Sequence, residues 1–159
     1  MTRVRPAGPG DLPGLVPLFL GYLDFYGERA ERDEVADYLT DLLEAGDSIV
    51  LVAERDAAAI GFAHLFPTPT MASRWILHDL FVAPVARRAG AGRALLGAAL
   101  EQARERGAGL LSLETAHDNV VARSLYETEG FERDEVFLTY HHDLPAGTRG
   151  DTSRTPRAP

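Results

Sequence analysis

The chain has 159 residues and a formal net charge of −8, and 45% of its residues are hydrophobic. This length predicts a single domain. The acidic charge disfavours nucleic acid and favours a small cationic partner, with plain solubility as the alternative explanation of the charge. The absence of cysteine excludes disulfides and thiolate chemistry, and no apolar run reaches the roughly 18 residues of a membrane span.

The first half of the chain predicts two helices and four strands. Apolar residues recur at helical spacing over 12–25, where Pro17 suggests a kink or a later start of the helix, and again over 31–45, where Gly46 is a typical helix end. Runs rich in β-branched and aromatic residues follow, and the short polar link 55–56 indicates a hairpin. The predicted strands of this half are 2–5, 48–54, 59–66 and 75–82.

The second half predicts a crossover unit and a closing pair of strands. A glycine-containing segment follows the strand 75–82 and opens a helix that ends near Gly107, before the next strand at 110–115. Because a strand, a helix and a strand in this order form a right-handed crossover, we expect these two strands to pair in parallel. Asp118 or Asn119 can cap a further helix. The predicted closing strands are 131–133 and 135–142.

Together these elements predict one α/β (α+β) domain over residues 1–144. Its central sheet is expected to be mixed and mostly antiparallel, with six to seven strands and about four helices distributed over both faces. The residues 145–159 are polar and rich in proline, glycine and arginine, so they are predicted to form a disordered C-terminal tail.

A small-residue loop lies where the predicted strand passes into the crossover helix: Arg87-Arg88-Ala89-Gly90-Ala91-Gly92-Arg93-Ala94. Small side chains leave backbone amides accessible, and a helix N-terminus attracts anions such as a pyrophosphate. No lysine occurs in the chain, which argues against a P-loop, and a dinucleotide fingerprint would lack its third glycine. A plain structural turn remains an alternative.

Two blocks of sequence carry a resemblance to a known family. The pattern Arg87-x-x-Gly90-x-Gly92, after the run Asp79-Leu80-Phe81-Val82-Ala83-Pro84, resembles the acetyl-CoA signature of the GNAT superfamily of N-acetyltransferases. The second block, from Leu113 to Phe131, is similar to the following strand and helix of that family. The overall pattern is similar to the yeast-type histone and polyamine (diamine) acetyltransferase branch.

The resemblance implies the GNAT fold and a direct transfer of an acetyl group from acetyl-CoA to an amine in a ternary complex. Asn119 would bind the coenzyme and Tyr126 would face its sulfur; their spacing of two helical turns places them on one face. The alternative role of Asn119 is a helix cap, and that of Tyr126 is a half-buried aromatic residue of the core. The implied coenzyme-binding residues are Leu80, Phe81, Val82, Arg87, Arg88, Ala89, Gly90, Ala91, Gly92, Arg93, Ala94, Asn119 and Tyr126.

The chemistry requires a proton acceptor, because an alkyl amine with a pKa near ~10.4 is almost fully protonated at neutral pH. His78 stands where the polyamine branch has a carboxylate, and a histidine titrates near neutrality. Asp79, expected on the opposite face by strand alternation, is a competing base or a ligand for a cationic acceptor. A water relay is the third possibility, whereas His64 is expected to be structural. Tyr126 can protonate the departing thiolate.

The acceptor side is expected at the end of the first helix, because the helix-loop-helix region borders the acceptor site in the resembled fold. Its acidic and aromatic residues suit a cationic amine or a basic peptide, although a solvated helix face is the alternative. The resemblance also implies a homodimer built through the C-terminal strands. The candidate substrate-binding residues are Tyr22, Asp24, Tyr26, Glu28 and Asp79.

The remaining expectations concern cofactors, location and a competing function. Acetyl-CoA is the expected co-substrate, and no metal is expected. The N-terminal residues lack the apolar core of an export signal, so a cytoplasmic location is expected. The competing function is a non-catalytic acyl-CoA sensor or interaction module, which would keep Gly90 and Gly92 but would need neither Tyr126 nor His78.

Overall fold

The computed structural model describes residues 1–142 and residue 144. The predicted tail at 145–159 lies outside the described residues. The chain divides into two compact units, Met1–Glu114 and Thr115–Pro159, and each is described by itself. The prediction of one domain over 1–144 stays a prediction.

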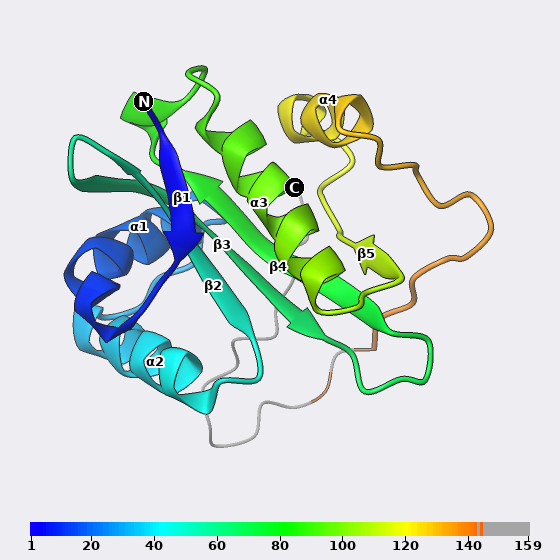
Figure 1. Ribbon diagram of the computed structural model, residues 1–159, viewed down its shortest axis with the longest axis horizontal. Coiled ribbons are helices and arrows are strands. Elements are labelled where there is room, and N and C mark those ends of the chain that lie inside the picture. Colours follow the sequence, from blue (N-terminus) through cyan, green and yellow to red (C-terminus); the bar gives the residue numbers. More distant parts are fainter. Residues whose placement is uncertain (143, 145–159) are drawn as a thin grey trace. The chain divides into compact units, whose positions relative to one another are not determined.

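The first unit is built on a five-stranded sheet in the order β1-β2-β3-β4-β5 (Figure 1). The first four strands pair antiparallel and β5 pairs with β4 in parallel, which confirms the predicted mixed sheet and its crossover. The strands are β1 (Arg3–Pro6), β2 (Ile49–Arg55), β3 (Ala58–Pro67), β4 (Arg74–Val82) and β5 (Leu110–Ser112).

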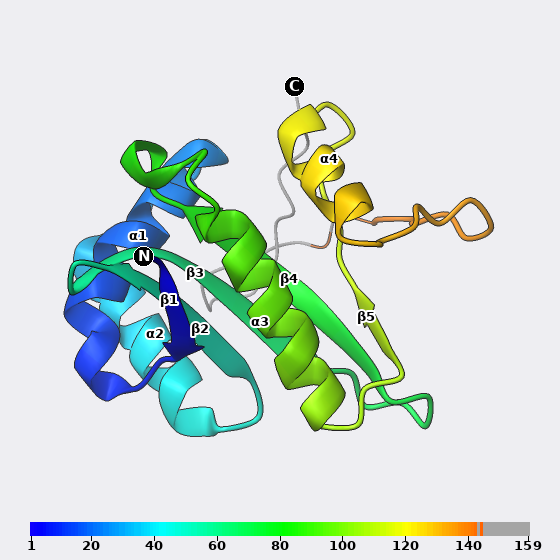
Figure 2. The same ribbon diagram turned by 45° about the horizontal axis from the view of Figure 1, so that its top comes forward.

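Helices cover both faces of this sheet, as the sequence predicts. Helices α1 (Leu12–Phe25) and α2 (Arg32–Ala45) lie on one face, and α3 (Ala91–Glu105) crosses the other (Figure 2). The side chain of Phe62 belongs to the apolar core beneath α1 and α2. The neighbouring Gly61 faces α3, because a Cβ there would approach Leu95 to 3.2 Å. Successive residues of β3 therefore face opposite sides of the sheet, and each side packs against a different set of helices.

The sheet has five strands in the described residues rather than the predicted six to seven. The segments 131–133 and 135–142 form no strand. The Asp134 carboxylate accepts hydrogen bonds from the backbone amides of Val136 and Phe137, at 2.8 and 2.9 Å. Such local side-chain bonds compete with a strand ladder, and alternating residues alone do not supply a pairing partner. The closing-strand prediction was wrong for this structure.

The second unit contains helix α4 (Val120–Thr128). Asn119 is its N-cap, and the Asn119 side chain accepts a hydrogen bond from the Ala122 amide at 3.2 Å. None of the helices in the described part of the chain combines the length and the apolar character that crossing a membrane requires.

Strand β4 has an open edge beyond its pairing with β5. The parallel ladder joins only Arg74–Ile76 to Leu110–Ser112. The residues Leu77–Val82 continue β4 without a β5 partner in the first unit as described. This part of β4 therefore has an edge that β5 does not cover.

Candidate active site

A buried carboxylate lies at the middle of β4. The side chain of Asp79 is only 3% exposed, and both of its oxygens have histidine partners. Oδ2 lies 3.2 Å from Nδ1 of His64 on β3, and Oδ1 lies 3.1 Å from Nδ1 of His78. The strands thus bring together two imidazoles and one carboxylate.

A β-bulge explains how two consecutive residues of β4 meet. The register pairs His64 with Asp79 but Leu65 with Leu77, so His78 has no residue opposite it on β3. An extra residue interrupts the alternation of a strand and redirects its side chain. The prediction that Asp79 lies on the face opposite His78 was therefore wrong. The bulge instead places their side chains within hydrogen-bond distance.

Aromatic residues from the helical face surround the carboxylate. Burial of the Tyr22 hydroxyl, followed by the charge of Asp79, raises the pKa of Tyr22, and an interaction of the hydroxyl with the Asp79 side chain adds to the rise. Burial and the charge of Asp79 also raise the pKa of Tyr26, and they raise that of Tyr38 to about 12. All three tyrosines are therefore neutral hydroxyl groups at physiological pH. Of the predicted substrate residues, the structure brings Tyr22 and Tyr26 to Asp79.

The two predicted acids of this region differ in position. The charge of Glu28 contributes to the raised pKa of Tyr22, which places it close to the cluster. Asp24 is exposed near the end of α1, and no contact between it and the cluster is found in the part of the chain that is described. The helix end is therefore acidic at its surface and aromatic toward Asp79.

The hydrogen bonds determine the protonation of the cluster. Burial disfavours the charge of Asp79, but hydrogen bonds from His64, His78 and Tyr22 hold the pKa of that carboxyl well below its usual range. A carboxylate can only accept, so we assign the Nδ1 proton to both histidines. In its neutral form each histidine then has a bare Nε2, which is a proton acceptor.

His78 is the accessible member of this cluster. Its side chain is 53% exposed, in contrast to those of His64 and Asp79. The hydrogen bond to Asp79 raises the pKa of His78 above its ordinary value, against a lowering by burial, and the charges of Asp79 and Glu114 add to the rise. His78 is therefore a solvent-facing base, and the buried Asp79 carboxylate stabilises its protonated form.

The same three residues can be considered as metal ligands. One ligand atom from each of His64, His78 and Asp79 lies within 4.8 Å of the others. Two imidazoles and a carboxylate suit several transition metals. The hydrogen bonds already pair these atoms, so we assign the cluster to proton transfer, and the prediction that no metal is needed stays a prediction.

The predicted anion loop has the backbone of an anion site. Arg88 and Gly90 both have positive φ, at 59° and 82°, and α3 begins at Ala91. The first intrahelical hydrogen bond runs from the Ala94 amide to the Gly90 carbonyl at 3.0 Å. The amides of Ala91 and Gly92 precede that bond and have no helical acceptor. Ala94 was predicted to donate as well, but its amide is already engaged in the helix.

Arg87 has a structural contact that the sequence did not indicate. Its Nε donates to the Val82 carbonyl at 3.0 Å, and its guanidinium carbon lies 5.6 Å from the ring centres of both Phe25 and Phe81. Arg87 therefore ties the loop to the end of β4 and to α1. Ala89 and Arg93 lie on the loop and on the first turn of α3, as predicted.

Leu80, Phe81 and Val82 occupy the open part of β4. Their antiparallel ladder to β3 pairs them with Ala63, Phe62 and Gly61. The side of β4 turned away from β3 has no strand partner beyond Ile76 in the first unit as described. An extended ligand can align there, between the histidine cluster and the glycine loop.

The chain is similar to known proteins over most of its length. The model of the acetyltransferase (GNAT) family matches residues 16–131, which is more than half of the chain. The chain belongs to the acetyltransferase (GNAT) family. The strand, loop and helix that the sequence associated with this family therefore lie within the matched region of a GNAT acetyltransferase.

Relatives of this acetyltransferase cover nearly its whole length. It is 41% identical over 147 residues to the uncharacterized N-acetyltransferase YhfO of Bacillus subtilis (strain 168), covering 91% of this chain and 99% of that protein. A crystal structure of a probable acetyltransferase has a TM-score of 0.84 at 33% identity, covering 91% of this chain and 99% of that one. Aminoglycoside N-acetyltransferase AAC(6')-Iy in complex with CoA has a TM-score of 0.76 at 19% identity over 91% and 96% of the two chains, a likeness of fold alone.

Two predicted site residues of the acetyltransferase belong to the second unit. Asn119 takes the alternative role that the sequence allowed, as the cap of α4. The half-buried Tyr126 lies on α4 with its ring centre 6.0 Å from that of Phe131. Their predicted contacts with the coenzyme stay predictions.

His64 lies closer to the candidate site than its sequence position indicated. It was expected to be structural, yet it contacts the Asp79 carboxylate directly. One sequence signal could have found it: His64 and Asp79 lie on the two strands expected to be adjacent. Only the cross-strand register shows that they are opposite each other.

Proposed function

We propose that this acetyltransferase transfers an acetyl group from acetyl-CoA to a primary amine, by direct attack in a ternary complex. The acceptor is a small cationic amine or a basic peptide. The observation that carries the proposal is the half-exposed His78, whose Nδ1 lies 3.1 Å from Oδ1 of the buried Asp79 carboxylate, beside the edge of β4 that β5 does not cover. This pair can remove a proton at the place where an extended thioester can align.

The first unit supports acetyl-CoA as the co-substrate. The amides of Ala91 and Gly92 open α3 at a left-handed Gly90, and Arg88 adds a full positive charge near them. Helix-end amides and arginine suit a pyrophosphate. The edge of β4 offers backbone groups to the pantetheine arm, in the way that an added strand pairs with a sheet. The structural relative in complex with CoA shares this fold.

His78 acts as the general base in the proposed reaction. Asp79 is unsuited to that role, because its lowered pKa and its hydrogen-bond partners leave it little affinity for a proton. The Nε2 of His78 takes a proton from the acceptor ammonium, and the free amine nitrogen attacks the thioester carbon. The new carbon–nitrogen bond forms as the amine adds to the carbonyl carbon, and the carbon–sulfur bond breaks when the tetrahedral adduct collapses. The second proton of the nitrogen passes to solvent, and Tyr126 regains from solvent the proton that it gives to the sulfur. The imidazolium is stabilised by Asp79 until its proton returns to solvent.

The departing sulfur requires a proton, and we assign this step to Tyr126 as the sequence predicts. Tyrosine transfers its proton to a thiolate with a pKa near ~8.5 at an uphill cost of about 2 kcal/mol. The acidic end of α1, with Asp24 and Glu28, attracts a cationic acceptor toward Tyr22 and Tyr26. We also propose that the protein belongs to the histone and polyamine branch of the family, that it forms a homodimer and that it is located in the cytoplasm.

A glycine substitution tests the coenzyme loop. We expect Gly90→Asp to weaken acetyl-CoA binding by about tenfold or more relative to Gly90→Asn, because it brings a negative charge to the pyrophosphate. The two side chains have nearly the same shape, both tolerate positive φ, and a Cβ at this position meets no atom within 4 Å. Calorimetric titration with acetyl-CoA measures the difference. Equal affinities in two folded variants would refute the loop assignment.

Thiol release from acetyl-CoA tests the function itself. The protein has no cysteine, so it contributes no thiol signal. We expect release with one class of amine among diamines, amino acids, aminoglycosides, arylamines and basic peptides, and a lower kcat in Tyr126→Phe with little change in acetyl-CoA affinity. Tight acetyl-CoA binding without release across the panel would instead favour the acyl-CoA sensor.

A further inference from the structure

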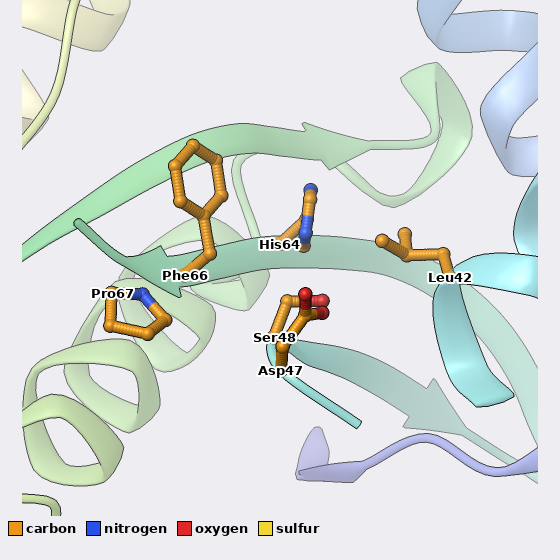
Figure 3. Close-up of a pocket in the computed structure, with 6 residues that line it drawn as sticks. All are labelled: Leu42, Asp47, Ser48, His64, Phe66 and Pro67. Atoms are coloured by element: carbon orange, nitrogen blue, oxygen red, sulfur yellow. The ribbon is translucent and has the colours of Figure 1, made fainter. Parts of the chain in front are cut away.

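A cavity beside His64 does not include the end of α1. Figure 3 shows this cavity, which is lined from α2, from the residues before β2 and from β3. The side chain of His64 in its wall is only 7% exposed, and the lining contains no residue of α1 or of the loop 87–94. The contacts that shape the proposed acceptor site at the end of α1 therefore lie outside this cavity.

Arg87 is fixed at the uncovered edge of β4. Its Nε donates a hydrogen bond to the Val82 carbonyl at 3.0 Å. The Ala83 amide, which belongs to the same peptide unit, donates to the Ile60 carbonyl on β3 at 2.9 Å. A trans peptide is planar and its N–H and C=O groups point in opposite directions, so the Val82 carbonyl faces away from β3. Arg87 therefore binds the last residue of β4 on the edge that β5 does not cover.

The guanidinium of Arg87 also lies against two aromatic rings. Its central carbon is 5.6 Å from the ring centre of Phe25 on α1 and 5.6 Å from that of Phe81 on β4. Both distances are within the range of a cation–π contact. Phe81 is buried, whereas Phe25 is 54% exposed. Arg87 thus connects the exposed ring of α1 to β4.

The Phe25 ring continues into the tyrosines of the proposed acceptor site. It packs edge-on against Tyr26, with ring centres 5.1 Å apart, and Tyr26 packs in the same way against Tyr22 at 5.0 Å. The Tyr22 side chain interacts with that of Asp79. The end of α1 therefore presents a continuous row of aromatic rings that leads from Arg87 to the buried carboxylate.

These rings lie where the helix stops. Phe25 is the last residue of α1 and Tyr26 is its C-cap, and the backbone then turns at Gly27 with a φ of 73°. Helix ends fray, so side chains on them need a tertiary contact to keep one position. The contact of Arg87 with Phe25 supplies one from the opposite side of the acceptor site.

We propose that Arg87 is a positioning residue for the acceptor, because it holds the end of α1 against β4 and so keeps Tyr22 and Tyr26 in place. This inference rests on the proposed function, since it concerns the acceptor site of the same reaction. It gives Arg87 a different role from the coenzyme contact that the sequence resemblance implies. The neighbouring Arg88 keeps its place on the coenzyme side.

Arg87→Gln and Arg88→Gln form a matched pair for the test. We expect Arg87→Gln to raise the KM of the amine by about 5- to 20-fold at saturating acetyl-CoA, since two cation–π contacts of about two- to fivefold each are lost. Its kcat and its acetyl-CoA Kd should change by less than about threefold. Arg88→Gln should do the reverse, with weaker acetyl-CoA binding and an unchanged KM of the amine. Initial rates and calorimetric titration measure the two quantities.

The loss of charge by itself works against the expected result. Both variants remove one positive charge from a protein whose net charge is −8. This change strengthens the attraction of a cationic amine and would lower its KM. A higher KM in Arg87→Gln alone therefore reports the position of α1 rather than the field of the protein.

Phe25→Leu tests the route from Arg87 to the acceptor, because this exposed ring can be replaced without opening a buried cavity. If Arg87 acts through Phe25, the double variant should raise the KM of the amine no more than the larger single variant does. Additive effects, or an unchanged KM in Arg87→Gln, would overturn the proposal. An acetyl-CoA Kd raised by about tenfold in Arg87→Gln would also overturn it and make Arg87 a ligand of the pyrophosphate.

Failure of the proposed function gives a different result. If the wild type acetylates no amine, that function fails, and the role of Arg87 is tested on the protein without an acceptor. Thermal midpoints of the two single variants and the double variant measure the coupling, and titration measures acetyl-CoA affinity. Non-additive losses with unchanged affinity would support the contact of Arg87 with α1. Additive losses, or weaker affinity in Arg87→Gln, would refute it.

Discussion

The variant His78→Ala is expected to lose about 100- to 10,000-fold in kcat, the range that a positioned general base contributes. The imidazole is half-exposed and hydrogen bonded to Asp79, so its removal takes away the base without opening a buried cavity. Thiol release at saturating acetyl-CoA and amine measures the loss. The thermal midpoint of the variant should stay close to that of the wild type.

The pH profile makes this prediction specific. The base must be neutral to accept a proton, and the hydrogen bond to Asp79 raises the pKa of His78. The wild-type rate should therefore fall as the pH drops through a pKa above the ordinary value of about 6.5. This acidic limb should disappear in His78→Ala and persist in His117→Ala, which changes an exposed histidine. A limb that persists in His78→Ala would identify another base or a water relay.

The variant Asp79→Asn is expected to reduce kcat by about 100-fold or more, because the buried carboxylate orients the base and stabilises its protonated form. Exchanging such a carboxylate for an amide costs about 10⁴ in a serine protease, where the histidine takes the wrong tautomer. An amide group would face both Nδ1 atoms here with one acceptor and one donor, so one histidine must change its tautomer. Initial rates with the preferred amine measure the effect.

The direction of the pH shift tests the role of Asp79 apart from its structural effect. Loss of the carboxylate removes the interaction that raises the pKa of His78, so the acidic limb should move to lower pH. The variant should also lose about 1–3 kcal/mol of stability, since His64 and Tyr22 lose a charged partner. Asp33→Asn, an exposed position of α2, is the control. A reduced kcat with an unmoved limb would indicate a structural role alone.

Much of the fold follows from local patterns. The helices over Leu12–Phe25 and Arg32–Ala45 lie within a residue of their predicted bounds, and Gly46 ends the second one in the left-handed conformation. Such ends depend on neighbouring residues only, so a sequence pattern can predict them. The prediction of the closing strands was wrong because a strand does not depend on neighbouring residues alone. A strand requires a partner, and the alternation in 135–142 does not supply one.

In the candidate site, too, some features follow from local sequence and others only from the tertiary structure. The sequence by itself determined the loop at Gly90 and the strand that carries His78 and Asp79, because glycine spacing and apolar runs are local features. Only the tertiary structure decided that His78 and Asp79 share a hydrogen bond and that His64 joins them. The physical reason is the register between β3 and β4: one extra residue at the bulge redirects a side chain, and that register depends on the packing of both strands.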